Sequence, residues 1–317
     1  RFTLRFEALP LMLAPTMSVL AAGRLVRVPP RRLWRVIEHH VGKARAKESH
    51  AEVRAVGVDE TACRRGQEYL SVFYDLDAQR LIFATPGRDK SCLERFAEDL
   101  TVHGGQPQAV THVSMDMSRS FQAGAAEHFP QATVCFDRFH VVALGSKALD
   151  EVRRAEVKSQ PELKGTRWSL LKNPSAWTIP QLQTMHWLQR SNLKTARAWR
   201  IKQALRAIYA TARSPDEARP LFQRWLSWAR RCRLDPFKGL ARTITTHLTG
   251  ILNGFEAGKH NGRVEAMNRA LQEARARARG YRRVENFIAM AYLVAGKLTH
   301  LPTPPFAQIA LVPHKTE

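Results

Sequence analysis

The chain has 317 residues, of which 44% are hydrophobic and 8% aromatic, so it can bury a large core and is not expected to be disordered. Its 50 Lys and Arg against 28 Asp and Glu give a net charge of +22, which attracts polyanions, above all nucleic acid. A ribosomal or membrane-surface protein would share that charge. The four cysteines form no C-x-x-C pair, which argues against a Cys-based zinc site or a disulfide framework. No run of about 20 apolar residues exists, so we expect a cytoplasmic, nucleoid-associated protein without a membrane span.

Residues 1–50 form a basic segment with a helical pattern. Within it, residues 18–41 predict two short helices around a turn, the second opened by Pro30. We expect the first helix to pack through Leu20, Ala21 and Leu25. The second is expected to pack through Leu33, Trp34, Val36 and Ile37.

This pair of helices is a candidate helix-turn-helix motif. Its second helix would offer DNA three arginines, Arg31, Arg32 and Arg35. The alternative is a helical hairpin that packs on the next domain and leaves these arginines in solvent.

Between residues 51 and 156 the pattern changes to alternating strands and helices. Strands are predicted at 51–61, 68–77, 80–87, 108–116 and 132–137. The first of them is apolar on both faces, which is typical of a buried strand. A helix is expected to begin at Ser91, with Ser91 and Glu94 as a capping box. Two more helices are expected over 118–129 and from Arg138 onward.

The resulting order, β-β-β-α-β-α-β, favours an RNase H-like fold over a doubly wound sheet, because its first three strands are consecutive. We therefore expect an α/β protein in which a large α-helical insertion interrupts an RNase H-like catalytic domain. The predicted divisions are a helical, helix-turn-helix-like DNA-binding segment at 1–50, the first part of the catalytic domain at 51–156, the α-helical insertion at 157–238, the C-terminal catalytic helices at 239–300 and an extended tail at 301–317.

Three acids stand out by their positions. Asp59 lies at the end of the first predicted strand, Asp116 ends the fourth, and Glu265 lies on a helix after the insertion. RNase H-like sheets place the first and fourth strands side by side, and a helix laid across the sheet can deliver Glu265. Two Asp and one Glu suit Mg²⁺, and a pair of such ions stabilises both oxygens of an in-line phosphodiester displacement. Each acid alone is more simply a turn or capping residue, but their joint topology favours a metal-binding triad.

The helix that contains Glu265 has a clear apolar stripe. The stripe consists of Val264, Met267, Leu271, Ala274 and Ala278. Glu265 lies one step off it, at the rim, where a carboxylate can face a metal ion without being buried unpaired.

Asp137 and His140 follow the fifth predicted strand. Asp137 is expected to cap the next helix, with His140 one turn further on the same side. They either border the active site and orient its groups, or form an ordinary capped helix. Asp137 is also the strongest rival of Asp116 for the place of second carboxylate.

Two further groups of basic residues are candidates for DNA contacts. Arg88 and Lys90 precede a helix N-terminus, where phosphate groups bind readily. Several arginines follow Glu265 along its helix: Arg269, Arg275, Arg277 and Arg279. The alternative for this second group is a solvated helix face.

The chain resembles the bacterial insertion-sequence transposases of the IS-L-three group over roughly residues 1–298. The resemblance depends on linked motifs, chiefly VGVDETACRRGQEYLSVFYDLD, VTHVSMDMSRSFQAGAAEHFPQATVCFDRFHVV and HNGRVEAMNRALQEARARARGYRRVENF. It implies a DDE catalytic domain with a helical insertion before the third acid. By motif, Asp59, Asp116 and Glu265 match the three acids in order. Asp137 and His140 match the D-x-x-H element that follows the second acid.

Two features depart from the pattern of that group. Its members usually have a Cys-rich zinc-binding segment upstream, and these 317 residues contain none. Arg27 and Pro29 stand where Gly and Ser are usual in the helix-turn-helix. The second departure affects the expected recognition of terminal repeats and leaves the three acids unchanged.

We therefore expect a DDE transposase that cleaves DNA at the ends of its element and then joins the freed 3′-hydroxyl to target DNA. The expected cofactor is a pair of Mg²⁺ ions, for which Mn²⁺ can substitute. The expected partner is double-stranded DNA, both the terminal repeats of the element and the target DNA. Further copies of the chain are expected to assemble on this DNA. Two rival hypotheses are an RNase H-like nuclease such as a junction resolvase, which cleaves without joining, and an inactive transposase-derived DNA-binding protein.

Overall fold

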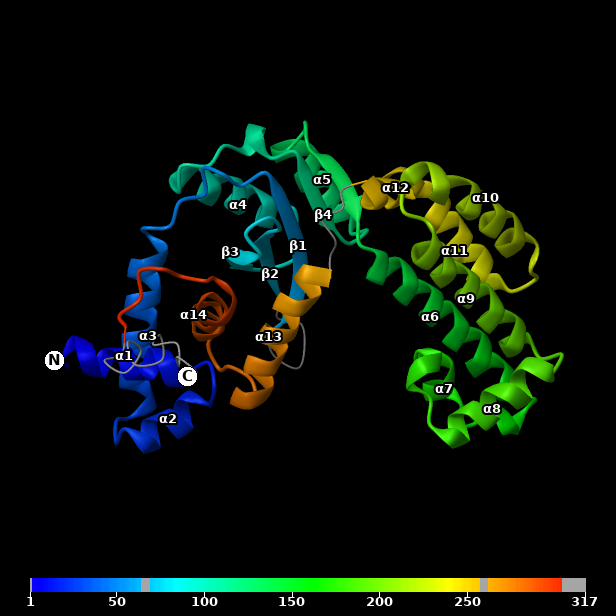
Figure 1. Ribbon diagram of the computed structural model, residues 1–317, viewed down its shortest axis with the longest axis horizontal. Coiled ribbons are helices and arrows are strands. Elements are labelled where there is room, and N and C mark those ends of the chain that lie inside the picture. The colour runs from blue at the N-terminus through cyan, green and yellow to red at the C-terminus, as the bar shows by residue number, and fades with distance from the viewer. Residues whose placement is uncertain (1, 64–68, 257–261, 304–317) are drawn as a thin grey trace, which may run out of the picture. The chain divides into compact units, whose positions relative to one another are not determined.

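The computed structural model describes residues 2–63, 69–256 and 262–303, without the side chains of residues 256, 262, 263, 265 and 266. The chain divides into two compact units: residues 1–133 with 259–317, and residues 134–258 (Figure 1). The functional divisions expected from the sequence remain predictions, and most of the expected extended tail, from residue 304 on, lies outside the described residues. None of the helices in the described part of the chain combines the length and apolar character that crossing a bilayer requires.

The first unit begins with three helices, α1 (Leu4–Leu13), α2 (Val19–Leu25) and α3 (Pro30–Arg45). Helices α2 and α3 confirm the predicted pair, and Pro30 is in the first turn of α3. The packing face of α3 is also as predicted, with Leu33, Val36 and Ile37 buried.

The packing face of α2 differs from the prediction. Leu20 and Leu25 are 53% and 64% exposed, and α2 packs instead through Val19, Ala22 and Gly23. The reason is the tight turn that follows. A Cβ on Gly23 would lie 2.7 Å from the carbonyl oxygen of Val28, so the glycine face must turn inward.

A five-stranded sheet forms the centre of this unit, although its last strand continues from Thr133 into the second unit. Its strands are β1 (Ala55–Ala62), β2 (Tyr69–Asp75), β3 (Arg80–Pro86), β4 (His112–Met115) and β5 (Thr133–Phe136). They lie in the order β3-β2-β1-β4-β5, with β1 antiparallel to β2 and parallel to β4. The expectation that the first and fourth strands are neighbours is therefore confirmed.

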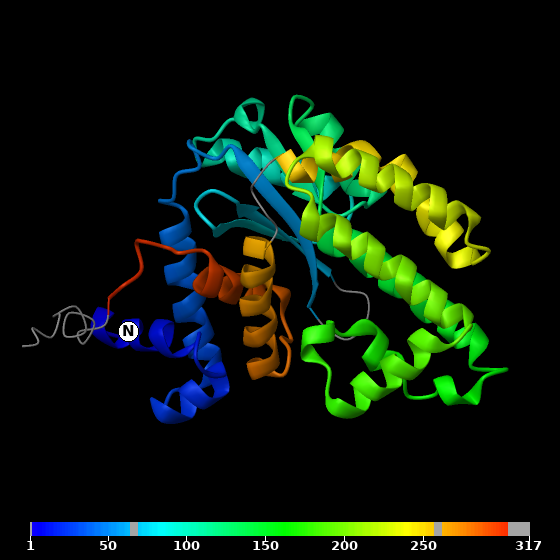
Figure 2. The same cartoon turned by 45° about the vertical axis from the view of Figure 1, so that its right-hand side comes forward.

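Helices cover both faces of the sheet (Figure 2). Helices α4 (Ser91–Val102) and α5 (Arg119–His128) pack against each other on one side, and α4 packs on β3. Helices α13 (Gly262–Ala278) and α14 (Val284–Ala295) lie on the other side, against β1 and β3. A short 3₁₀ turn, Pro107–Ala109, leads into β4.

The cap of α4 differs from the predicted capping box. Ser91 is inside the helix, and the carboxylate of Asp89 accepts hydrogen bonds from the backbone N–H (2.9 Å) and hydroxyl (2.5 Å) of Ser91. An acid two residues upstream thus takes the role expected of Ser91, because Asp caps as well as Ser.

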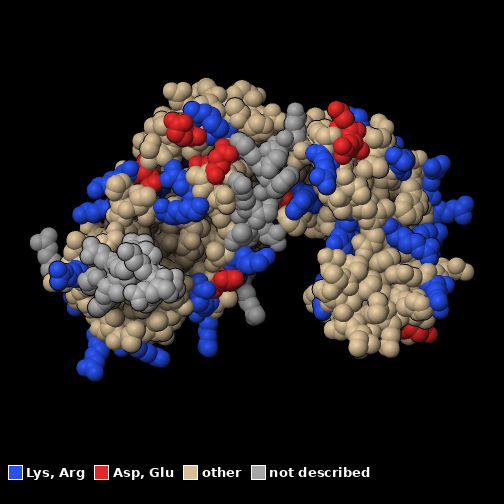
Figure 3. Space-filling view, viewed as in Figure 1, with Lys and Arg blue, Asp and Glu red and all other residues tan. Residues whose placement is uncertain are grey.

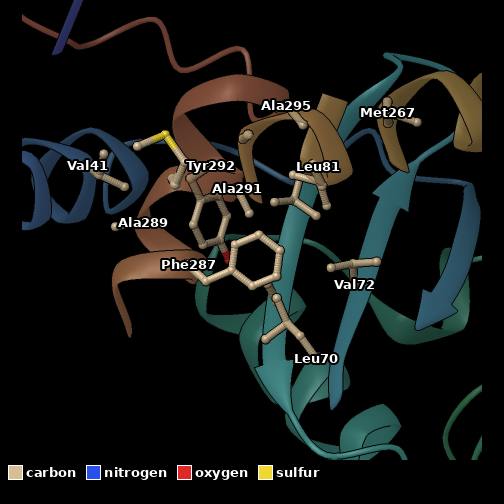
Figure 4. Close-up of a cluster of buried hydrophobic side chains, with 14 of the residues drawn as sticks. Val41, Leu70, Val72, Leu81, Met267, Phe287, Ala289, Ala291, Tyr292 and Ala295 are labelled. Atoms are coloured by element: carbon tan, nitrogen blue, oxygen red, sulfur yellow. The ribbon is translucent and has the colours of Figure 1, made fainter. Parts of the chain in front are cut away.

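The apolar core on the α14 side joins the N-terminal helices to the sheet (Figure 4). Phe287 and Tyr292 of α14 lie over Leu70 and Leu81, while Val41 approaches from α3. The opposite face of the sheet packs through Phe73, whose ring stacks on Phe96 of α4 at 4.5 Å. This alternation fixes which residues of each strand face α13 and α14.

The second unit is helical throughout the described residues after β5. Its helices are α6 (Arg138–Glu156), α7 (Arg167–Leu171), α8 (Ile179–Arg190), α9 (Lys194–Thr211), α10 (Pro215–Arg231), α11 (Asp235–Thr246) and α12 (Leu248–Glu256), with 3₁₀ turns at Pro161–Leu163 and Pro174–Ala176. Helix α9 packs against α6, α8 and α10. The Glu156 carboxylate accepts hydrogen bonds from the backbone N–H groups of Lys194 and Thr195 and so caps α9.

Candidate active site at the junction of strands β1 and β4

Asp59 is half-buried in the second half of β1. The sequence placed it at the strand end, but β1 continues to Ala62 because it still pairs with β2, where Asp59 lies opposite Val72. The parallel pairing with β4 is shorter and stops at Gly57, opposite Ser114. Asp59 therefore lies just beyond the part of β1 that has neighbours on both edges.

Asp116 follows β4 directly, as expected from the sequence. Asp59 is two residues past Gly57, and Asp116 is two residues past Ser114, the partner of Gly57. Each acid therefore lies two residues beyond the last residue pair of the parallel register, at the end of the sheet where the pairing of β1 with β4 stops. One oxygen of Asp116 accepts a hydrogen bond from the backbone N–H of Ser118 at 2.9 Å, which fixes the turn into α5.

Helix α13 is held against the same face of β1. The side-chain amide of Asn268 donates a hydrogen bond to Oδ2 of Asp59, and one turn later Gln272 donates to Oγ1 of Thr61 at 2.5 Å. Asp59 and Thr61 share one face of β1 because side chains alternate along a strand. Two successive turns of the helix thus contact two successive positions on that face.

Tyr74 of β2 completes this contact. Its hydroxyl donates a hydrogen bond to Oδ1 of Asn268 at 2.6 Å. Burial raises the pKa of Tyr74 well above its usual value, and the nearby Asp59 raises it further, so the hydroxyl stays protonated and remains a donor. With its oxygen bound by Tyr74, the amide of Asn268 must present its NH₂ group to Asp59.

Glu265 lies on α13, three residues before Asn268, and its side chain lies outside the described residues. The position of its backbone follows from its neighbours. A Cβ on Gly57 would lie 2.8 Å from Cγ2 of Val264, so the strand and this turn of the helix are in close contact. The apolar stripe predicted for α13 is confirmed, since Val264, Met267, Leu271 and Ala274 are buried. The sequence position of the third acid is therefore on the turn of α13 that approaches β1.

Asp137 and His140 belong to the second unit and form the capped helix that the sequence predicts. Oδ1 of Asp137 accepts a hydrogen bond from the backbone N–H of Phe139 at 2.8 Å, and Oδ2 lies 3.2 Å from Nδ1 of His140. The chain before them is fixed by α12, where the amide of Asn253 donates to the carbonyl oxygen of Val134 at 2.9 Å. The expected role of Asp137 and His140 beside the three acids remains a prediction.

The candidate DNA-binding residues are mostly exposed. Exposed members are Arg31, Arg32, Arg35, Arg88, Lys90, Arg269, Arg277 and Arg279, while Arg275 is half-buried. Lys and Arg clearly outnumber Asp and Glu on the visible surface in Figure 3. Several of these residues already have contacts within the chain. The guanidinium of Arg88 lies 4.4 Å from the ring of Tyr69, and Arg277 donates to the carbonyl oxygen of Pro15 at 2.7 Å.

A hollow at the C-terminal end of α13 has a basic lining. Its volume is about 630 Å³, and its walls include Arg275, Arg279, Arg282, Gln272 and Cys63. Arginine is the side chain best suited to phosphate groups because its guanidinium donates two parallel hydrogen bonds. The hollow begins at Gln272, one turn of α13 beyond the contact between Asn268 and Asp59.

Comparison with known proteins decides the family. The family model of ISL3-group DDE transposases, described as "Transposase", matches residues 56–291. The chain belongs to this family of transposases. It is 31% identical to the "Transposase for insertion sequence element IS1557" of Mycobacterium tuberculosis, over 96% of this chain and 73% of that protein. It is also 26% identical to the "Transposase for insertion sequence element IS1001" of Bordetella parapertussis, over 80% of this chain and 65% of that protein.

The matched range of the transposase family starts in β1 and ends in α14, so it includes the sheet, the helical unit and α13. Sequence reasoning missed Asn268 and Tyr74. Asn268 contacts Asp59 directly, and Tyr74 contacts it through the side chain of Asn268. A signal for Asn268 was present, because it lies three residues after Glu265 and therefore one turn further on nearly the same helix face. Nothing in the sequence alone singles out Tyr74 from other aromatic strand residues.

Proposed function

We propose that this transposase cleaves DNA at the ends of its element and joins them to target DNA, with Asp59, Asp116 and Glu265 as the catalytic carboxylates of an RNase H-like domain. The observation that supports this most strongly is the register of β1 and β4. Asp59 and Asp116 each lie two residues beyond its last pair, Gly57 with Ser114, although 57 residues separate the two acids in the chain. Hydrogen bonding from Asn268 to Asp59 brings the helix that contains Glu265 to the same face.

The donor groups at this site fit divalent metal ions with a preference for oxygen. Asp59 and Asp116 offer carboxylate oxygens, which are the ligands that Mg²⁺ prefers. We propose that these two residues and Glu265 hold two Mg²⁺ ions, for which Mn²⁺ can substitute. Such ions neutralise the charge on the attacking and leaving oxygens of a phosphodiester displacement. Asn268 fixes the orientation of the Asp59 carboxylate, and Tyr74 fixes that of Asn268.

The basic residues bind the DNA in this proposal. Arg275 and Arg279 line the hollow beside the C-terminal end of α13, and Arg269 lies nearer the acids on the same helix. Arg88 and Lys90 precede α4, whose N-terminus adds a favourable field for a phosphate group. Arg277 contributes less, because Pro15 already accepts one of its hydrogen bonds.

The N-terminal helices form the helix-turn-helix-like segment of the proposal. The buried face of α3 packs on α14, while Arg31, Arg32 and Arg35 stay exposed. This arrangement suits contact with the terminal repeats of the element, and equally suits the helical hairpin with solvated arginines. We propose the first, with further copies of the chain assembling on the same DNA. Asp137 and His140 support and orient groups around the acids.

A strand-transfer assay with the native element ends tests this function. Wild-type protein with Mg²⁺ is expected to cut the ends and join them to a target plasmid, and Asp59→Asn is expected to abolish both while DNA binding persists. The matched control is Asp77→Asn, an exposed acid in the β2–β3 turn, which should keep full activity. Cleavage without joining would support a nuclease of the resolvase kind. DNA binding without cleavage by the wild-type protein would identify an inactive derivative.

A further inference from the structure

Three side chains of metal-binding type converge in the first unit, away from the acids described above. His50 lies in the loop after α3, Asp99 lies in the last turn of α4, and His103 is the C-cap residue that follows α4. One ligand atom from each lies within 4.8 Å of the corresponding atoms of the other two. His50 is only 2% exposed, and Asp99 and His103 are half-buried.

Two polar atoms of this cluster are buried without a hydrogen-bond partner. They are Nδ1 of His50 and Oδ2 of Asp99. A buried polar atom in this state is costly, and most such atoms in proteins are bound by a protein group, a water molecule or an ion. A cation bound between them would satisfy both, because each atom can supply a lone pair.

The remaining atoms of the cluster are held in the way that metal ligands usually are. Nδ1 of His103 lies 2.8 Å from the backbone carbonyl oxygen of Asp99, which can only accept, so Nδ1 donates and Nε2 has the lone pair. Metal-binding histidines commonly donate their second N–H to a carbonyl in this manner. The guanidinium of Arg45 donates to Oδ1 of Asp99, and Oδ2 of Asp99 lies 3.6 Å from Nδ1 of His103. The backbone N–H of His50 donates to the carbonyl oxygen of His103 at 2.9 Å, which ties the loop to the helix end.

Two guanidinium groups lie near the cluster, and each is paired with a carboxylate. Arg45 is paired with Asp99, and Arg80 is paired with Glu48 at 2.6 Å.

We propose that His50, Asp99 and His103 bind one Zn²⁺ ion at the junction between α3 and α4. Two imidazole nitrogens and one carboxylate oxygen suit zinc, whereas Mg²⁺ prefers oxygen ligands. The site has no cysteine, so it is unlike a Cys-rich zinc-binding segment. Zinc bound there links the loop after the N-terminal helices to α4 and so stabilises the way these helices meet the sheet.

Metal analysis of the full-length chain tests this site separately from the catalytic one. The Asp59→Asn/Asp116→Asn double variant serves as the background, since it removes two carboxylates that could also hold zinc. After zinc loading and extensive dialysis, this variant should retain one zinc per chain by elemental analysis. Its Tm should also rise on adding Zn²⁺, because a ligand that binds only the folded state stabilises it.

Adding His103→Gln to that background should weaken zinc binding by at least about tenfold and remove the zinc-dependent rise in Tm. His128→Gln, which changes a histidine of α5 outside the cluster, should leave both unchanged and is the matched control. His50→Gln should behave as His103→Gln does, and His103 is the safer variant because it is less buried. A background variant that retains no zinc and shows no rise in Tm would overturn the proposal, as would unchanged binding in His103→Gln. Neither result would bear on the Mg²⁺-dependent cleavage proposed above.

Discussion

Asp59 lies within β1 and Asp137 directly follows β5, and these two aspartates have very different surroundings. One oxygen of the Asp59 carboxylate accepts a hydrogen bond from the backbone N–H of Glu60, and the other accepts one from Asn268, which is 209 residues away in the chain. The carboxylate of Asp137 is bound by Phe139 and His140, which are two and three residues away. The capped turn of Asp137 needs only the first turn of α6, whereas the environment of Asp59 exists only once α13 has closed over β1. The hydrogen bonds of Asp137 described above are those of a local cap, whereas Asp59 is also held by a helix that is distant in the sequence.

The largest expected effect separates the two candidates for the second carboxylate. Asp116→Asn should abolish Mg²⁺-dependent cleavage, because it removes a proposed metal ligand. Asp137→Asn should only weaken cleavage, by about 10–100-fold, because an amide oxygen can still cap α6 and the loss is that of a supporting group. Initial rates on a labelled element-end duplex, with binding measured in parallel, give the comparison. The opposite order would make Asp137 the ligand and would refute the interpretation of the β1–β4 register.

The contact between β1 and α13 can be broken at Gly57. In Gly57→Ala the new Cβ would meet Val264 Cγ2 and Leu76 Cδ2 at 2.8 Å each, so these side chains must move, and we expect the turn of α13 that contains Val264 to move with them. We expect a loss of about 1–3 kcal/mol in the free energy of unfolding, and a loss of cleavage because the turn that contains Glu265 moves. Urea denaturation measures the first effect. Gly42→Ala in α3 is the control, since a Cβ there meets nothing within 4 Å and alanine favours a helix. Equal stability of the two variants would contradict the close contact.

Asn268 tests whether the link from α13 to Asp59 matters for chemistry. Asn268→Ala leaves the buried Tyr74 hydroxyl without its acceptor, which should cost about 1–3 kcal/mol of stability. The Asp59 carboxylate loses its orienting donor, so cleavage should also fall and require more Mg²⁺. Gln272→Ala, one turn further along α13 and exposed, should have a smaller effect on both measurements. If Mg²⁺ dependence is unchanged in Asn268→Ala, the hydrogen bond to Asp59 is purely structural.

The smallest expected effect concerns DNA affinity. A log–log plot of affinity against salt falls by roughly 0.9 per phosphate neutralised, so Arg275→Ala with Arg279→Ala should flatten the slope by up to about 1.8. Arg277→Ala should change it less, since this guanidinium already binds the carbonyl oxygen of Pro15. Fluorescence anisotropy over a salt series provides the slopes. A slope unchanged in the double variant would make Arg275 and Arg279 part of a solvated helix face.

The sequence predicted most elements of the fold correctly where a periodic pattern was strong. The order of strands and helices, the adjacency of β1 and β4 and the buried stripe of α13 are all confirmed. Predictions that depended on one or two residues were less successful. Leu20 and Leu25 are exposed because the tight approach at Gly23 selects another face of α2, and Asp89 caps α4 in place of Ser91.

The sequence by itself determined the kinds of element and their order, because alternation along strands and the period of helices are local properties. It also determined the family, through motifs spread over most of the chain. Only the tertiary structure decided that Asn268 and Tyr74 hold Asp59 and that His50 meets Asp99 and His103. These contacts join residues far apart in the chain, and the geometry of side chains across such distances is set by packing, which no local pattern encodes.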